Sequence, residues 1–204
     1  MSTNTYHHGE LRGELIRRGI ELLSRGGPGS LDTQPVKSLS LRGLAREAGV
    51  SATAVYHHFP SKEALLEEIA VSLLTDLIAR WEQLSPDHIA RAYLDFFRAR
   101  PGLLNLLFGQ ELSGSARVLE LQQQAFQVLL DRIPGEGPRK ERTAMLLWVL
   151  VHGLSSLAVS GALGVPPGSC PGGPDIFEQD PGELLGDLTG ILRPLLVTGT
   201  LESP

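Results

Sequence analysis

The 204-residue chain contains a single cysteine, Cys170, and few aromatic residues, which make up 5% of the sequence. One cysteine excludes an internal disulfide framework and a cysteine-rich metal cage, and it fits a reducing cytoplasm. The six histidines include no His-Glu-x-x-His spacing, so no metal site is predicted. The sequence also lacks a nucleophile–base pair and a phosphate-cradling glycine loop. We therefore expect no enzyme activity and no cofactor.

The chain also lacks an overall excess of positive charge, since its net charge is −5. This argues against a uniformly basic nucleic-acid binder. The distribution is uneven, however. Residues 1–62 hold eight Lys and Arg against five Asp and Glu, whereas residues 63–204 hold ten against eighteen. A basic end on an acidic remainder suits a small DNA-reading head on a larger body that does not touch DNA.

The N-terminus has no long apolar core, so we expect no secretory signal. One uncharged stretch, Ala144–Val165, is long enough to span a bilayer. Polar and small residues such as His152, Ser155, Ser160 and Gly153 interrupt it. We therefore favour a buried helix of a cytoplasmic protein over a membrane span, and solubility of the expressed protein distinguishes the two.

Apolar residues recur at helical spacing in successive segments, which glycine and proline separate, and no alternating strand pattern occurs. The predicted fold is all-α, with about nine helices. The helices are expected at about 9–24, 41–48, 52–58, 61–84, 85–100, 103–112, 116–133, 138–164 and 183–197. The segments 26–38 and 165–182 are expected to be loops. We place an N-terminal domain at residues 1–62 and a C-terminal domain at residues 63–204.

The two short predicted helices at 41–48 and 52–58 form the most informative segment. Ser40 and Ser51 are good N-cap residues for them, and Gly49 permits the left-handed residue of a tight turn. Ala45 is small enough for two helices to cross closely. These features predict a helix-turn-helix unit at about residues 40–59.

At 100° per residue, the second short helix divides into two sides. The polar side comprises Ala52, Thr53, Tyr56 and His57, and the apolar side Ala54, Val55 and His58, with Phe59 just beyond. The polar side fits a major groove. Lys62 begins the next helix, where its ammonium group and the free backbone N–H groups favour a phosphate.

The run from Leu39 to Leu65, above all Tyr56-His57-His58-Phe59-Pro60-Ser61-Lys62, resembles the DNA-binding domain of the tetracycline-repressor (TetR) family. The segments 100–109 and 148–154 resemble the C-terminal half of a TetR subset more loosely. The resemblance implies an all-α homodimer with a three-helix DNA head and a ligand-binding, dimerising body. It implies DNA contacts for Ser40, Arg42, Thr53, Tyr56, His57 and Lys62. With Ser51 and Ala52, at the start of the second short helix, these form the predicted set of eight DNA-contact residues.

Two features depart from the family pattern. The loop from Gly26 to Ser38 is longer than usual, which leaves open whether Lys37 reaches DNA. Gly43 lies inside the first motif helix, where glycine costs about 0.5–1 kcal/mol relative to alanine.

Large side chains of the second domain are candidates for an effector pocket. They are Trp81, Phe97, Phe108, Phe126, Trp148 and His152. The alternative is that they form ordinary core, with His152 hydrogen-bonded inside it.

The favoured function is a transcriptional regulator, a homodimeric repressor that leaves double-stranded operator DNA when a small apolar or amphipathic effector binds. The first alternative is an effector-independent activator or architectural DNA-binding protein. The second is an enzyme fused to a DNA-binding head.

Overall fold

The computed structural model describes residues 8–25, 35–160, 180–187 and 190. These residues contain nine labelled α-helices, a further helical segment, one 3-10 helix and no strand, which confirms the predicted all-α fold. The elements are α1 His8–Ser24, α2 Pro35–Ser38, α3 Leu41–Ala48, α4 Ala52–His58, α5 Lys62–Trp81, α6 Pro86–Ala99, α7 Pro101–Phe108, η1 Gln110–Leu112, α8 Ala116–Arg132 and α9 Gly137–Ser160. Residues 181–187 are also helical.

Several predictions concern parts of the chain outside the described residues. They include most of the loop at 165–182 and the end of the helix expected at 183–197. The prediction of a loop at 35–38 was wrong, because these residues form the short helix α2. Pro35 occupies its first position, where the missing N–H group costs nothing. The single helix expected at 103–112 is divided into α7 and η1.

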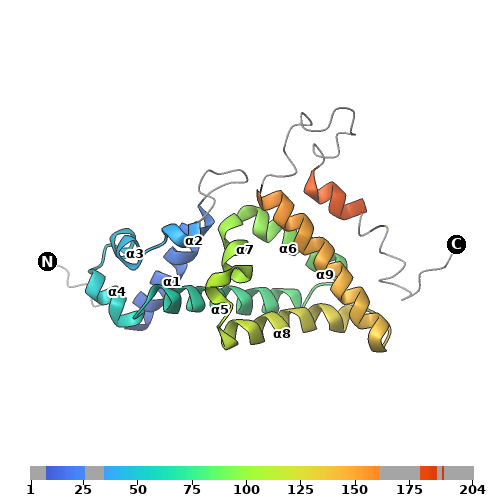
Figure 1. The fold of residues 1–204 in the computed structure, drawn as a ribbon, viewed down its shortest axis with the longest axis horizontal. Helices are drawn as coiled ribbons and strands as arrows, with labels where there is room; N and C mark the ends of the chain where they lie inside the picture. The colour runs from blue at the N-terminus through green and yellow to red at the C-terminus, as the bar shows by residue number, and fades with distance from the viewer. Residues whose placement is uncertain (1–7, 26–34, 161–179, 188–189, 191–204) are drawn as a thin grey trace.

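The helices divide into a head and a body that share helix α5 (Figure 1). Helices α1 to α4 form the head at the end of the molecule that carries the N-terminus, and α5 runs from there into the body, with α8 alongside it. Near its start, the buried residues Leu65 and Ile69 face Gly19 of α1. Near its end, Leu74 and Leu77 face α6 and α8 inside the body. One helix therefore belongs to both cores.

A second junction joins head and body at the start of α7. A Cβ atom built on Gly102 would lie 2.2 Å from the carbonyl oxygen of Leu23 at the end of α1. It would also lie 2.6 Å from a side-chain carbon of Pro35 in α2. Only a residue without a side chain allows α7 to approach the head this closely.

A carboxylate links the head to the body through α5. Glu68 of α5 pairs with Arg12 of α1 at 2.5 Å and with Arg117 of α8 at 2.6 Å. Burial alone would raise the pKa of Glu68, but hydrogen bonds from Arg117 and Arg12 lower it below its ordinary value. Glu68 is therefore charged at neutral pH and holds both arginines.

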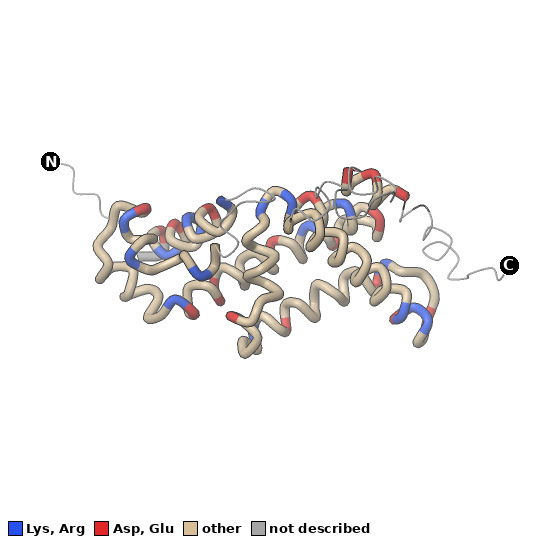
Figure 2. The backbone as a smooth tube through the Cα atoms, turned by 45° about the horizontal axis from the view of Figure 1, so that its top comes forward, with Lys and Arg blue, Asp and Glu red and all other residues tan. Residues whose placement is uncertain are grey.

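Helix α9 exposes apolar side chains along one side, which we call the α9 stripe. Its members are Leu146, Val149, Leu150 and Leu157, each 37–57% exposed. After Arg142 the helix carries no Lys, Arg, Asp or Glu, and its tube is tan over most of its length (Figure 2). By length and composition alone α9 could cross a membrane. Of its most apolar 18-residue stretch, 33% is buried inside the protein. Its other side packs against α6 and α8.

Candidate nucleic-acid interface and ligand cavity

The joint between α3 and α4 is built as the sequence predicts. The Ser40 and Ser51 hydroxyls accept hydrogen bonds from the backbone N–H groups of Gly43 and Ala54, both at 3.1 Å, and so cap the two helices. Gly49 has φ 68°, the left-handed region, and ends α3. The next N–H group, of Val50, donates to the Ala45 carbonyl at 3.0 Å. These bonds fix the direction in which α4 leaves α3.

Helix α4 has one buried side and one exposed side. Val55 and Phe59 are almost completely buried. Thr53 and His57 are exposed, and Tyr56 is 46% exposed. The division of α4 into two sides is therefore confirmed. The structure brings the predicted contact residues of α4 to one outer surface, with Ala52 half-buried at its edge.

The other predicted contact residues flank this surface. Arg42 is exposed on α3, while Ser40 and Ser51 use their hydroxyls as helix caps. The Lys62 amine donates to the backbone carbonyl of Lys37 in α2 at 3.0 Å. Lys62 therefore joins the start of α5 to α2, and Lys37 itself is exposed beside it. Figure 1 shows α3 beside α4 and the start of α5 just after it, with α2 farther along, near α7.

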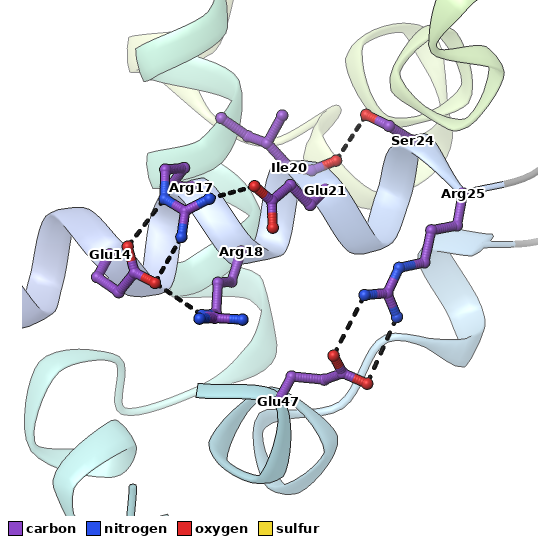
Figure 3. A network of polar contacts seen from close by, with 8 residues as sticks. All are labelled: Glu14, Arg17, Arg18, Ile20, Glu21, Ser24, Arg25 and Glu47. Carbon is purple, nitrogen blue, oxygen red and sulfur yellow. Dashed lines mark hydrogen bonds and ion pairs between the residues drawn. The ribbon is translucent and has the colours of Figure 1, made fainter. Parts of the chain in front are cut away.

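Arginines of α1 are held by carboxylates (Figure 3). Glu14 accepts hydrogen bonds from Arg17 and Arg18, and the Arg17 bond is the main reason that its pKa is lowered. Arg25, just after α1, pairs with Glu47 of α3 at 3.2 Å, which lowers the pKa of Glu47. These pairs orient α1 and α3, and they neutralise much of the basic charge that the sequence places in the head.

The body contains a cavity of about 650 Å³, enough for a drug-sized ligand. Helices α5, α6, α8 and α9 and the end of α7 surround it. It is lined by Leu74, Leu77, Trp81, Ile89, Ala90, Tyr93, Phe97, Leu107, Phe108, Leu119, Gln122, Gln123, Ala125, Phe126, Gln127, Leu129, Met145, Leu147, Trp148 and Val151. Five of the six predicted pocket residues are among them.

The sixth predicted residue, His152, is not in the lining of the cavity. Its Nδ1 atom lies 2.7 Å from the Tyr93 hydroxyl, and its ring stacks on Trp148 at 19°. Burial lowers the pKa of His152 and raises that of Tyr93, so both are uncharged at neutral pH. His152 therefore contacts three lining side chains, those of Tyr93, Trp148 and Phe108, without lining the cavity itself.

Sequence reasoning missed Tyr93 and the three lining glutamines of α8. Gln122 is half-buried, and its amide nitrogen donates to the Leu107 carbonyl at 2.6 Å. A signal existed, because Gln122, Gln123, Phe126 and Gln127 fall on one side of a helix. Polar residues on the side that carries a large aromatic ring are typical of a ligand site more than of dry core.

Two family models match the chain. The model for bacterial regulatory proteins of the tetR family matches residues 15–69. The model for the C-terminal domain of tetracyclin repressor-like proteins matches residues 87–170. The first covers the joint and α4, and the second covers most of the helices around the cavity.

Similar proteins are known by sequence and by structure. The nucleoid occlusion factor SlmA of Alteromonas mediterranea is 35% identical over 127 residues, which cover 53% of this chain and 65% of that protein. The chain spans between about a third and two thirds of the curated relatives it matches.

Solved structures that are similar over most of this chain include the following two. A Rhodococcus sp. RHA1 protein of unknown function has a TM-score of 0.72 at 26% identity, covering 96% of this chain and 100% of that one. A tetR-family transcriptional regulator from Streptomyces coelicolor has a TM-score of 0.56 at 25% identity, covering 91% and 81%. The two family matches together span more than half of the 204 residues, and the chain belongs to the TetR family of bacterial regulatory proteins.

Proposed function

We propose that the protein is a DNA-binding transcriptional regulator, most simply a repressor, that a small apolar or amphipathic molecule releases from its operator. The outer surface of α4 is the observation that supports this most directly. Thr53, Tyr56 and His57 lie on it, while Val55 and Phe59 fix the helix to the core. A helix held in this way can enter a major groove with its polar side toward the bases.

The flanking residues complete the proposed interface. Arg42 and Lys62 are cations beside α4, and they can contact backbone phosphates on either side of the groove. Such contacts fix the position of the head on the duplex but do not select a sequence. We assign the selection of bases to Thr53, Tyr56 and His57.

The protein is proposed to act as a homodimer in the cytoplasm. The α9 stripe is the proposed subunit interface, since an exposed apolar surface on a long helix suits self-association. Two heads then read two half-sites one helical turn apart. A membrane span is disfavoured because the side of α9 opposite the stripe is buried against α6 and α8.

Helix α5 is the proposed route from the cavity to the head. Its residues Leu74, Leu77 and Trp81 line the cavity, and its residues Leu65 and Ile69 pack against α1. A ligand that binds more tightly to one spacing of the two heads shifts the dimer toward that spacing. Release requires that this spacing no longer fits the operator. No catalysis and no cofactor are part of this proposal.

A second candidate is DNA binding that no small molecule regulates. The similarity to a nucleoid occlusion factor over 127 residues favours it. The two candidates differ in one measurement. A molecule that fills the cavity lowers operator affinity under the first and leaves it unchanged under the second.

The test begins with selection of binding sites from random duplex DNA by the full-length protein, followed by gel shift. We expect a near-palindromic site, and Tyr56→Ala should weaken binding to it by at least about tenfold. Gln124→Ala, on the exposed side of α8, is the matched control and should bind normally. Failure to select any sequence would contradict the proposal. Unfolding of Tyr56→Ala would show that the assignment of α4's sides is wrong.

A further inference from the structure

The cavity gathers most of the aromatic residues of a chain that has few. Both tryptophans, one of three tyrosines and three of six phenylalanines line it. Neighbouring rings are tilted against one another, with Phe97 and Phe108 at 66° and Phe108 and Trp148 at 55°. Such walls offer both ring faces and ring edges. An aromatic ligand gains edge-to-face and stacked contacts here that an alkyl chain cannot make.

No charged side chain occurs among the described residues that line the cavity. The titratable group directly behind the lining is His152, which is hydrogen-bonded to Tyr93. An ionised ligand group placed here would lose its water without gaining a counter-charge, which is costly. The cavity therefore favours a ligand that is uncharged where it is enclosed.

Gln122 supplies a directed polar contact. Its amide nitrogen faces the Leu107 carbonyl at 2.6 Å, and a carbonyl can only accept, so the orientation of the amide is fixed. Among the described residues, the Gln122 amide oxygen has no hydrogen-bond partner. A ligand O–H or N–H group can satisfy it. The Leu107 bond holds this acceptor in place before the ligand arrives, which reduces the entropic cost of binding.

From these three observations we infer that the cavity selects an uncharged aromatic molecule that carries a hydrogen-bond donor, such as a phenol. The inference rests on the proposed function only in treating the cavity as the effector site. Ring contacts with the lining favour aromatic over aliphatic ligands, the absence of charge selects against carboxylates, and Gln122 distinguishes a hydroxyl from its methyl ether.

The test is direct binding to the full-length protein without DNA, by titration calorimetry at neutral pH, with four matched probes. They are para-phenylphenol, para-methoxybiphenyl, para-phenylbenzoate and dodecanol. We expect para-phenylphenol to bind most tightly. The ether, which leaves the Gln122 oxygen unsatisfied, and the benzoate should each bind at least about tenfold more weakly. Equal or tighter binding of the benzoate or of dodecanol would overturn the inference, and so would binding of no probe.

Two variants assign the preferences to residues. Gln122→Leu should bind the phenol and its ether equally, and Phe126→Leu should reduce the preference for para-phenylphenol over dodecanol. Gln124→Leu, two residues along and on the exposed side of α8, should change neither ratio. Within each variant, the affinities of the four probes are compared as ratios. A loss of stability that weakens the binding of all four probes therefore does not alter these ratios. An unchanged phenol-to-ether ratio in Gln122→Leu would contradict the role of Gln122.

The ligand class and the proposed function fail separately. If para-phenylphenol binds as expected but leaves operator affinity unchanged, the ligand class holds and release by an effector is contradicted. If selected DNA binds but the probes bind in another order, the regulator stands and the ligand class is wrong.

Discussion

Lys62 shows how one side chain combines a structural and a functional role. Its amine donates to the Lys37 carbonyl, and it stands at the first turn of α5, where free N–H groups attract an anion. A phosphate there would contact both the amine and the helix. When the Lys62 ammonium group neutralises a DNA phosphate, about one counterion condensed on the DNA is released. The salt dependence of the binding constant therefore reports this contact.

We expect Lys62→Ala to weaken binding to all DNA sequences alike. The slope of log affinity against log salt should become shallower by about one. Fluorescence anisotropy with operator and with random duplex, at several salt concentrations, measures both effects. Lys140→Ala, at the start of α9 and far from the head, is the control. An unchanged slope would mean that Lys62 serves only to join α5 to α2.

At the residue scale, the sequence predicts the features that depend on helical geometry alone, such as which side chains share one side of a helix. The two sides of α4 follow from the spacing of Thr53, Val55 and Tyr56. Gly43 could not be explained in this way. A Cβ atom there would lie 3.0 Å from the Ser40 hydroxyl oxygen, the atom that caps α3. Glycine at this position therefore leaves room for the cap, which stabilises a helix by about 1 kcal/mol.

At the scale of the helices, Glu68 of α5 connects α1 to α8 through its two ion pairs. We expect Glu68→Gln to lower the free energy of unfolding by about 1 kcal/mol, because two arginines lose their shared partner. Glu21→Gln is a matched control, since Glu21 pairs only within α1 (Figure 3) and such pairs contribute about 0.2–0.5 kcal/mol. Urea unfolding at neutral pH compares the two.

The Glu68 contribution should also depend on pH. The folded protein lowers the pKa of this carboxyl, so its stabilising effect is complete above the pKa of the unfolded chain. It is lost as the pH falls through the lower value of the folded state. The difference between wild type and Glu68→Gln should therefore disappear in acid. A difference that persists there would mean that the lost contact is not ionic.

Close approach of α7 to the head makes Gly102 sensitive to any side chain. Gly102→Ala should lower the free energy of unfolding by about 2 kcal/mol, because the added carbon meets the Leu23 backbone. Gly13→Ala, on α1 with open space around it, should instead stabilise by about 0.5–1 kcal/mol. Thermal unfolding distinguishes them by sign. An equally stable Gly102→Ala would mean that α7 can move away freely.

The helix that the sequence missed, α2, has a tertiary cause. Its four residues follow a segment rich in glycine, and they are too few for a helical pattern to emerge. Pro35 and Val36 are nevertheless buried, and Pro35 lies beside Gly102 of α7. Packing between the head and the body therefore stabilises α2, and no local sequence pattern reports such a contact.

At the scale of the whole molecule, the α9 stripe leads to a prediction about assembly. Leu146→Glu combined with Val149→Glu should give a folded monomer, because two charges cannot be buried in an apolar interface. Gln124→Glu, which adds charge on exposed α8, should remain dimeric. Analytical ultracentrifugation measures the mass, and gel shift should show loss of operator binding with the monomer. A monomeric wild type, or one that partitions into membranes, would contradict the dimer.

The cavity is also a property of the whole molecule, which limits what a sequence can say of it. Trp81, Phe97, Phe126 and Trp148 lie on four different helices and were predicted by size and apolarity alone. Whether such residues enclose a space or fill it depends on how the four helices pack. His152 was predicted because it is a polar residue in an apolar helix, but it lies outside the lining and is hydrogen-bonded to Tyr93.

The placement of both tryptophans at the cavity has a practical consequence. The chain has only two tryptophans, Trp81 and Trp148, and both line the cavity. The ultraviolet emission of the unmodified protein therefore arises almost entirely from the place where a ligand would sit. Occupancy should change its intensity and wavelength without any dye or label. The protein is in this respect its own optical reporter, and compound collections can be screened against it in plain buffer before any operator is known.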